Sequence, residues 1–204
     1  MKICGVTTVA DAIGCAKVGV DAIGLNFVPG SPRRIEEEAG RAIVEALAGE
    51  VGDRVLIVGV VANRSADEMR ALRRATGVGC LQLHGDESPA DVAAVLPHAY
   101  KAVPIEGAQD VAGAEAMPGE YLLVDARVPG LRGGTGRSFD WRLVAGLAAR
   151  RRLVLAGGLS PANVQAAIAV VHPFCVDVAS GVESAPGRKD LAMVEAFVAR
   201  ARSV

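Results

Sequence analysis

The chain has 204 residues and a formal net charge of -1, with 51% hydrophobic but only 3% aromatic residues. Charges of both signs are mixed along it, which argues against nucleic acid or an anionic membrane as a partner. No apolar run reaches the roughly 18 residues of a membrane span, and no leader-like segment precedes the first apolar stretch. We therefore expect a soluble cytoplasmic protein, with one domain over residues 1–204.

Short β-branched apolar stretches alternate with helical stretches along the whole chain. Predicted strands cover residues 2–4, 21–27, 54–62, 80–83, 99–105, 121–125, 152–158 and 174–181. Predicted helices cover residues 8–18, 36–48 and 190–202, and others start at the capping residues Ser65, Ser88, Asp140 and Ser160. Residues 108–116 are only weakly helical, so a loop or a single turn fits there. The pattern predicts an α/β protein with a single (β/α)8 barrel, and a doubly wound open sheet is the alternative.

The cysteines and histidines do not form a metal-binding pattern. The four cysteines are scattered, without a CxxC pair, so they read as free thiols that are mostly small buried apolar residues. His98 and His172 lie just before predicted strands, whereas His84 ends one. The starts and ends of parallel barrel strands lie at opposite faces, so the three histidines cannot converge on one ion.

Several reactive side chains stand at the carboxyl ends of predicted strands, the face where barrel enzymes carry their catalytic groups. Cys4 ends the first strand and can act as a base if nearby cations and amides lower its pKa, although a structural cysteine fits equally well. Asp125 and Asp177 interrupt apolar strands near their ends. Such a carboxyl group can act as a general acid when burial raises its pKa, or it can simply cap loop amides.

Glycine-containing loops follow the last two predicted strands. Gly157-Gly158 comes after strand seven and Ser180-Gly181 after strand eight. Barrels frequently bind phosphate at these two loops, because glycine lets backbone amides approach the anion closely, although tight turns alone also require glycine. Arg33, after strand two, can pair with a carboxylate through two hydrogen bonds. A small phosphorylated substrate is the partner we expect.

Six fragments, in order along the chain, together resemble the phosphoribosylanthranilate isomerase family. They are KICG, GLNFVPGSPR, QLHGDE, LLVDARVPGLRGGTGRSFDW, LAGGLSPANV and VDVASGVESAPGRKD. The resemblance implies an Amadori rearrangement of N-(5-phosphoribosyl)anthranilate to 1-(2-carboxyphenylamino)-1-deoxyribulose 5-phosphate, the third step from chorismate to tryptophan. It also implies that the enzyme needs neither a metal nor an organic cofactor. We expect a monomer or a homodimer.

The same resemblance assigns roles to individual residues. It makes Cys4 the general base, Asp125 the general acid, and Arg33 the group that grips the anthranilate carboxylate. Gly134 and Gly136 belong to the loop after strand six, which is expected to close over the substrate. The other positions that match the family's substrate pocket are His84, Asp177, Gly157, Gly158, Ser180 and Gly181.

Three other functions are considered. A non-catalytic barrel that binds a sugar phosphate is disfavoured by the presence of Cys4, Asp125 and Arg33. A Schiff-base aldolase would use Lys101, which we take to be the only lysine in the interior of a predicted strand, away from the strand's ends. A dual-substrate isomerase that also serves the histidine pathway would resemble a two-fold symmetric barrel, and the chain has no matching half-repeat.

Overall fold

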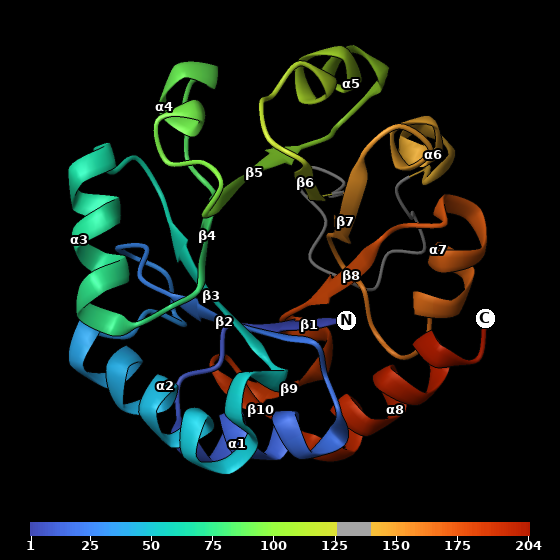
Figure 1. The fold of residues 1–204 in the computed structure, drawn as a ribbon. Coiled ribbons are helices and arrows are strands. Elements are labelled where there is room, and N and C mark those ends of the chain that lie inside the picture. The colour runs from blue at the N-terminus through green and yellow to red at the C-terminus, as the bar shows by residue number, and fades with distance from the viewer. Residues whose placement is uncertain (126–139) are drawn as a thin grey trace.

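Eight parallel strands follow one another around a closed barrel, and the helices surround it (Figure 1). This computed structural model describes residues 1–125 and 140–204. The predicted barrel is confirmed and the open sheet is wrong, because β1 pairs with both β2 and β8. The strands are β1 (Lys2–Cys4), β2 (Ala22–Asn26), β3 (Leu56–Val61), β4 (Cys80–Leu83), β5 (Ala99–Pro104), β6 (Tyr121–Asp125), β7 (Arg152–Ala156) and β8 (Cys175–Val178).

The helices on the outside of the barrel differ in length. They are α1 (Val9–Val18), α2 (Glu37–Val51), α3 (Ala66–Thr76), α4 (Pro89–Ala93), α5 (Ala108–Glu115), α6 (Arg142–Ala148), α7 (Val164–Val171) and α8 (Leu191–Arg202). Short elements complete the chain: η1 (Gly52–Arg54), η2 (Ser180–Val182), β9 (Glu183–Ala185) and β10 (Arg188–Lys189). In the described part of the chain, none of the helices is long and apolar enough to cross a membrane.

Local capping explains where several helices begin, and it corrects two of our expectations. The capping box at Ser65 and the N-cap at Ser88 are present as predicted, and Ser88 also forms a capping box with Asp91. Residues 108–115 form a true helix, because the carboxylate of Asp110 accepts from the backbone amides of Glu106 and Gly107 at 2.9 and 3.0 Å. Ser160 instead heads a turn, and α7 begins only at Val164.

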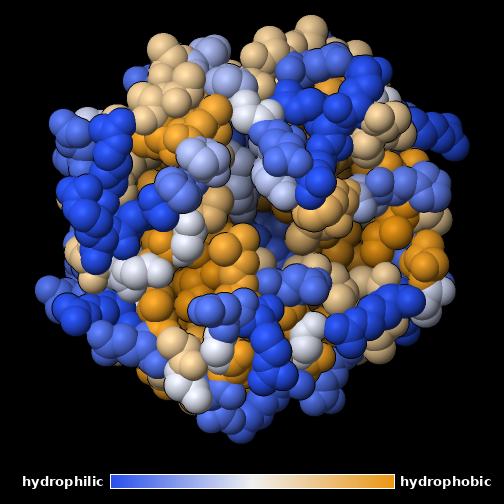
Figure 2. Space-filling model, viewed as in Figure 1, coloured by the Kyte–Doolittle hydropathy of each residue, from blue (hydrophilic) through white to orange (hydrophobic). Residues whose placement is uncertain are grey.

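Strand alternation separates two apolar layers. The larger layer lies between the strands and the helices, and it includes Ile3, Leu25 and Phe197. The smaller layer fills the barrel interior; its members are Ala22, Val58, Tyr100, Ala102, Leu123, Val154 and Ala156. Cys15 is buried as expected, whereas Cys80 and Cys175 are only partly buried, against the interior cluster. Hydrophilic side chains spread over much of the outer rim, with apolar side chains between them (Figure 2).

Candidate active site

Cys4 is the last residue of β1, and alternation places it on the same face of that strand as Lys2. Its neighbour across the strand pair is Gly24, where a methyl group would lie only 2.7 Å from the Cys4 sulfur. The glycine therefore makes room for the thiol. Burial raises the pKa of Cys4; the ammonium of Lys2 opposes this, Asp177 adds to it, and Lys189 opposes it again.

Lys2 is fully buried inside the barrel, where its ammonium group donates hydrogen bonds to two side chains. Its Nζ donates to Asp177 Oδ2 at 2.8 Å and to Gln82 Oε1 at 2.7 Å. The hydroxyl of Tyr100 donates to the same Gln82 oxygen at 3.1 Å. Burial lowers the pKa of Lys2, but the carboxylate of Asp177 raises it well above its ordinary value. A permanent positive charge therefore lies beneath Cys4.

The network continues from Gln82 to the acid on the other side of the barrel mouth. Gln82 Nε2 lies 3.0 Å from His84 Nδ1. Since the Gln82 oxygen already accepts from Lys2 and Tyr100, its amide nitrogen is the donor and Nδ1 is the acceptor. The ring proton is then on Nε2, which faces Asp125 Oδ2 at 3.8 Å. Asp125 itself is buried at the end of β6.

Arg33 lies at the same mouth and is held by a carboxylate of the chain itself. Its Nε and Nη2 donate to Glu183 Oε1 and Oε2 at 2.8 and 2.6 Å. Lys189, also buried, donates from Nζ to Glu183 Oε1 at 2.7 Å and to the Cys4 carbonyl at 2.6 Å. Burial raises the pKa of Glu183, but the hydrogen bonds and charges of Arg33 and Lys189 lower it overall, so the carboxylate is ionised at neutral pH.

The loops after β7 and β8 meet each other. Gly157 and Gly158 have positive φ angles of 98° and 65°, a conformation that favours glycine. A methyl group at Gly181 would overlap the Leu159 carbonyl oxygen, so only glycine lets the two loops approach this closely. Ser180 begins η2 directly after β8 and beside this contact. Gly134 and Gly136 lie outside the described residues.

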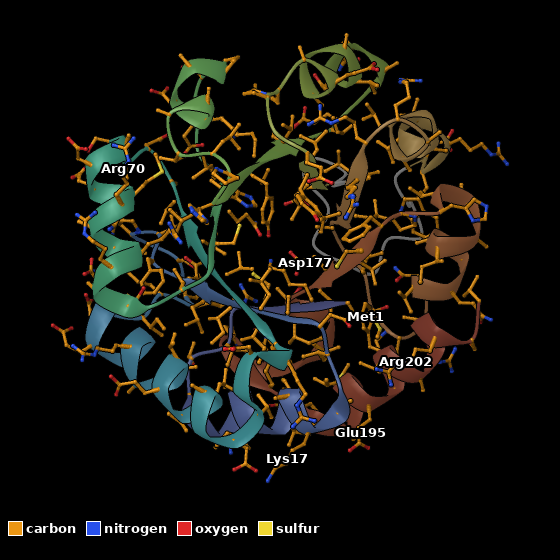
Figure 3. All side chains as sticks on the ribbon, viewed as in Figure 1. Met1, Lys17, Arg70, Asp177, Glu195 and Arg202 are labelled. Carbon is orange, nitrogen blue, oxygen red and sulfur yellow. The ribbon has the colours of Figure 1, made fainter. Side chains whose placement is uncertain are left out.

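The structure places most of the predicted site residues at one end of the barrel, but Asp177 lies deeper, in the interior. Cys4, His84 and Asp125 end or follow strands at the mouth. Asp177 pairs with Lys2 inside the barrel and does not stand at the rim; it lies near the barrel axis in Figure 3, whereas Lys17 and Arg202 lie on outer helices.

Lys101 does not serve the aldolase chemistry considered above. Its Nζ donates to the backbone carbonyls of Leu83 and Gly85 at 3.2 and 2.7 Å and pairs with Glu87 at 3.1 Å. Its strand neighbours Tyr100 and Ala102 face the barrel interior, so Lys101 faces outward. The Schiff-base expectation is wrong, and Lys2 is the lysine that a strand turns into the barrel.

Sequence reasoning missed five residues of this site: Lys2, Gln82, Tyr100, Glu183 and Lys189. Two of them carried a readable signal. The alternation in KIC puts Lys2 on the face of Cys4, and that in QLH puts Gln82 on the face of His84. In the described part of the chain, no group of three or more His, Cys, Asp or Glu side chains could hold a metal ion.

Comparison with known proteins decides the family. Residues 1–200 match the family model described as N-(5'phosphoribosyl)anthranilate (PRA) isomerase. The chain belongs to this family. It is therefore an isomerase of tryptophan biosynthesis with a (β/α)8 barrel fold. The N-(5'-phosphoribosyl)anthranilate isomerase of Myxococcus xanthus is 44% identical over 209 residues, covering 100% of this chain and 96% of the relative.

Solved structures of other phosphoribosylanthranilate isomerases agree with this membership. The Thermotoga maritima structure has a TM-score of 0.88 and 36% identity, and covers 100% of this chain and 98% of that one. A second structure was determined in complex with reduced 1-(o-carboxyphenylamino)-1-deoxyribulose 5-phosphate. It has a TM-score of 0.86 and 34% identity, again over 100% of this chain and 98% of the other.

Proposed function

We propose that this chain performs the family's isomerisation with Asp125 as the general acid and Cys4 as the general base. The observation that carries the assignment is the buried network at the barrel mouth. Lys2 lies beneath Cys4, and from Lys2 hydrogen bonds run through Gln82 to His84, which faces Asp125. Two titratable groups on well-separated strands thus stand beside the same polar network at one mouth, an arrangement that suits an acid and a base acting on one substrate.

The reaction then needs only proton transfers and the substrate's own electrons. Asp125 protonates the furanose ring oxygen; the C1–O bond breaks, and the nitrogen lone pair forms a C1=N iminium bond. The Cys4 thiolate removes the proton from C2, and the C–H electrons form a C1=C2 bond as the iminium electrons return to nitrogen. The resulting enolamine takes a proton at C1 and loses its hydroxyl proton, giving the ketone. We propose that no metal or organic cofactor takes part.

Substrate binding is proposed to use the remaining mouth residues. Arg33 binds the anthranilate carboxylate, and the Gly157-Gly158 and Ser180-Gly181 loops bind the phosphate through backbone amides. Asp177 and His84 support the two catalytic groups, Asp177 by keeping Lys2 charged and His84 by facing Asp125. Gly134 and Gly136 remain proposed members of the closing loop. We also propose a cytoplasmic location and a monomeric or homodimeric state.

The test is substitution of the two catalytic groups with a matched cysteine control. Each of Cys4→Ser and Asp125→Asn should lower kcat by roughly 10²- to 10⁴-fold, the usual contribution of one general acid or base. Cys80→Ser makes the same chemical change at a cysteine that begins β4, away from the mouth. It should leave kcat within about twofold of the wild-type value, since it removes no acid–base group. Turnover is followed by loss of substrate fluorescence, and folding by circular dichroism. Normal turnover in the Cys4→Ser/Asp125→Asn double variant would show that the assignment is wrong.

A further inference from the structure

Three charged side chains, one from the loop after β2 and two from the short segment after β8, form one cluster at the mouth. Arg33 follows β2, Glu183 begins β9, and Lys189 ends β10. The side chains of Lys189 and Glu183 are 0% and 4% exposed, whereas that of Arg33 is 21% exposed. The cluster therefore has two members inside the protein and one that is partly exposed at the mouth.

Glu183 uses only one edge of the Arg33 guanidinium. The hydrogen bonds come from Nε and Nη2. A guanidinium has five N–H donors in a fixed plane, so three donors, on Nη1 and Nη2, are left for another acceptor. One N–H of Nη1 and one of Nη2 point the same way, along what we call the end edge of the guanidinium. Their spacing matches the two oxygens of a planar carboxylate. Glu183 thus accepts from the side edge, formed by Nε and Nη2, and leaves the end edge available to another carboxylate.

Lys189 holds Glu183 in turn and connects it to the strand that carries Cys4. Its Nζ donates to the carbonyls of Cys4 and Ala179 at 2.6 and 3.3 Å and to Glu183 Oε1 at 2.7 Å. These three bonds use all the donors of an ammonium group. The carboxylate of Glu183 is consequently fixed against the ends of both β1 and β8.

We infer that Glu183, held by Lys189, is a positioning residue that orients Arg33 so that its end edge receives the substrate's aromatic carboxylate. The inference rests on the proposed role of Arg33. Glutamine at position 183 would keep one acceptor oxygen for Arg33 but would place an NH2 donor where the second bond is now accepted. The plane of the long Arg33 side chain would then no longer be fixed, and binding would have to order it. The contribution of Glu183 is therefore specific to ligands that carry the carboxylate.

The experiment compares two ligands on the intact enzyme. One is reduced 1-(o-carboxyphenylamino)-1-deoxyribulose 5-phosphate, and the other is the same compound without its carboxyl group. Wild type should prefer the carboxylated ligand by roughly 10- to 100-fold, as expected for charge-assisted hydrogen bonds. Glu183→Gln, which is nearly isosteric, should weaken the carboxylated ligand about tenfold and leave the other unchanged, because the ordering cost falls on the carboxylate contact alone. Titration calorimetry measures both affinities.

Kinetics and two further variants separate positioning from folding. Glu183→Gln should raise KM about tenfold with kcat within about twofold, since only uniform binding is lost. Glu183→Asp retains the charge, and its preference between the ligands should be intermediate. Glu87→Gln is the matched control, because Glu87 is equally buried and pairs with Lys101 in the loop after β4, apart from the Arg33 cluster. Its ligand preference should equal that of wild type.

The outcomes distinguish this inference from the proposed function. If wild type does not prefer the carboxylated ligand, the role of Arg33 itself is wrong. If wild type prefers it and Glu183→Gln keeps the full preference, the inference is overturned while the role of Arg33 stands. Tighter binding of the carboxylated ligand by Glu183→Gln would also overturn it, because Glu183 would then compete with the substrate for Arg33.

Discussion

The Cys4 thiol is placed between opposing electrostatic influences. Burial favours its neutral form, and the buried carboxylate of Asp177 adds to that effect. The ammonium groups of Lys2 and Lys189 favour the thiolate. Burial is the largest of these effects, so the pKa of Cys4 is raised overall. A thiolate is the form that can remove a proton, so the two lysines limit this rise and keep more of the base active at a given pH. Lys2 is the larger of these two favourable influences.

Replacing Lys2 with methionine should therefore move the activity of the base to higher pH. Lys2 lowers the pKa of Cys4, so its removal raises that pKa and shifts the ascending limb of kcat/KM towards alkaline pH. The rate of Cys4 alkylation by iodoacetamide should shift in the same direction. Lys17→Met, on an exposed side chain of α1, is the control and should leave both profiles unchanged. Coincident profiles for Lys2→Met and wild type would contradict this role of Lys2.

At the scale of elements, the contact between the loops after β7 and β8 shapes the proposed phosphate site. Gly181 lies against the Leu159 carbonyl, and the side chain of Asn163 bonds back to the Gly158 carbonyl at 3.0 Å. The loops therefore support each other before any ligand is bound.

Gly181→Ala tests this contact directly. The added methyl group overlaps a backbone carbonyl, so one loop must shift, and we expect KM to rise about tenfold or more because the phosphate-binding amides are displaced. The melting temperature should also fall. Gly49→Ala, in exposed α2 with open space around it, is the matched control and should raise stability by roughly 0.5–1 kcal/mol. An unchanged KM in Gly181→Ala would show that the loop contact does not shape the site.

At the scale of the whole molecule, buried ion pairs join different elements of the barrel. Glu183 pairs with Arg33 and Lys189, and Glu87 pairs with Lys101. The pKa values of both glutamates are lowered overall, although burial alone raises them. Their stabilising effect is complete above the pKa of the unfolded chain, about 4.3, and is lost as pH falls through the lower folded value.

The melting temperature should accordingly fall as the pH is lowered below about 4.3, the unfolded glutamate pKa. Glu87→Gln removes one of the responsible carboxylates, so its melting temperature should be lower than that of wild type at pH 7 and should change less between pH 5 and 3. Scanning calorimetry over that range measures both effects. Glu38→Gln makes the same change at an exposed position of α2. Its melting temperature should depend on pH as that of wild type does. An equal slope in Glu87→Gln would assign the acid sensitivity to other groups.

The sequence by itself determined the alternation of strands and helices, their order and the strand-end positions of Cys4, His84 and Asp125, and it favoured the barrel over the open sheet. These features depend on hydrophobic periods and capping residues, which act over a few neighbouring positions. The helix at 108–115 was missed for a local reason too, since its cap comes from Asp110 and its apolar pattern is weak.

Only the tertiary structure decided which charges meet. Lys2 and Asp177 are 175 positions apart, and Arg33 and Glu183 are 150 positions apart. Such pairs form only when the barrel closes and brings β8 and the segment after it against β1 and the loop after β2. Closure also turned Lys2 inward and Lys101 outward, because strand alternation is local but the face that becomes the interior is a property of the closed sheet.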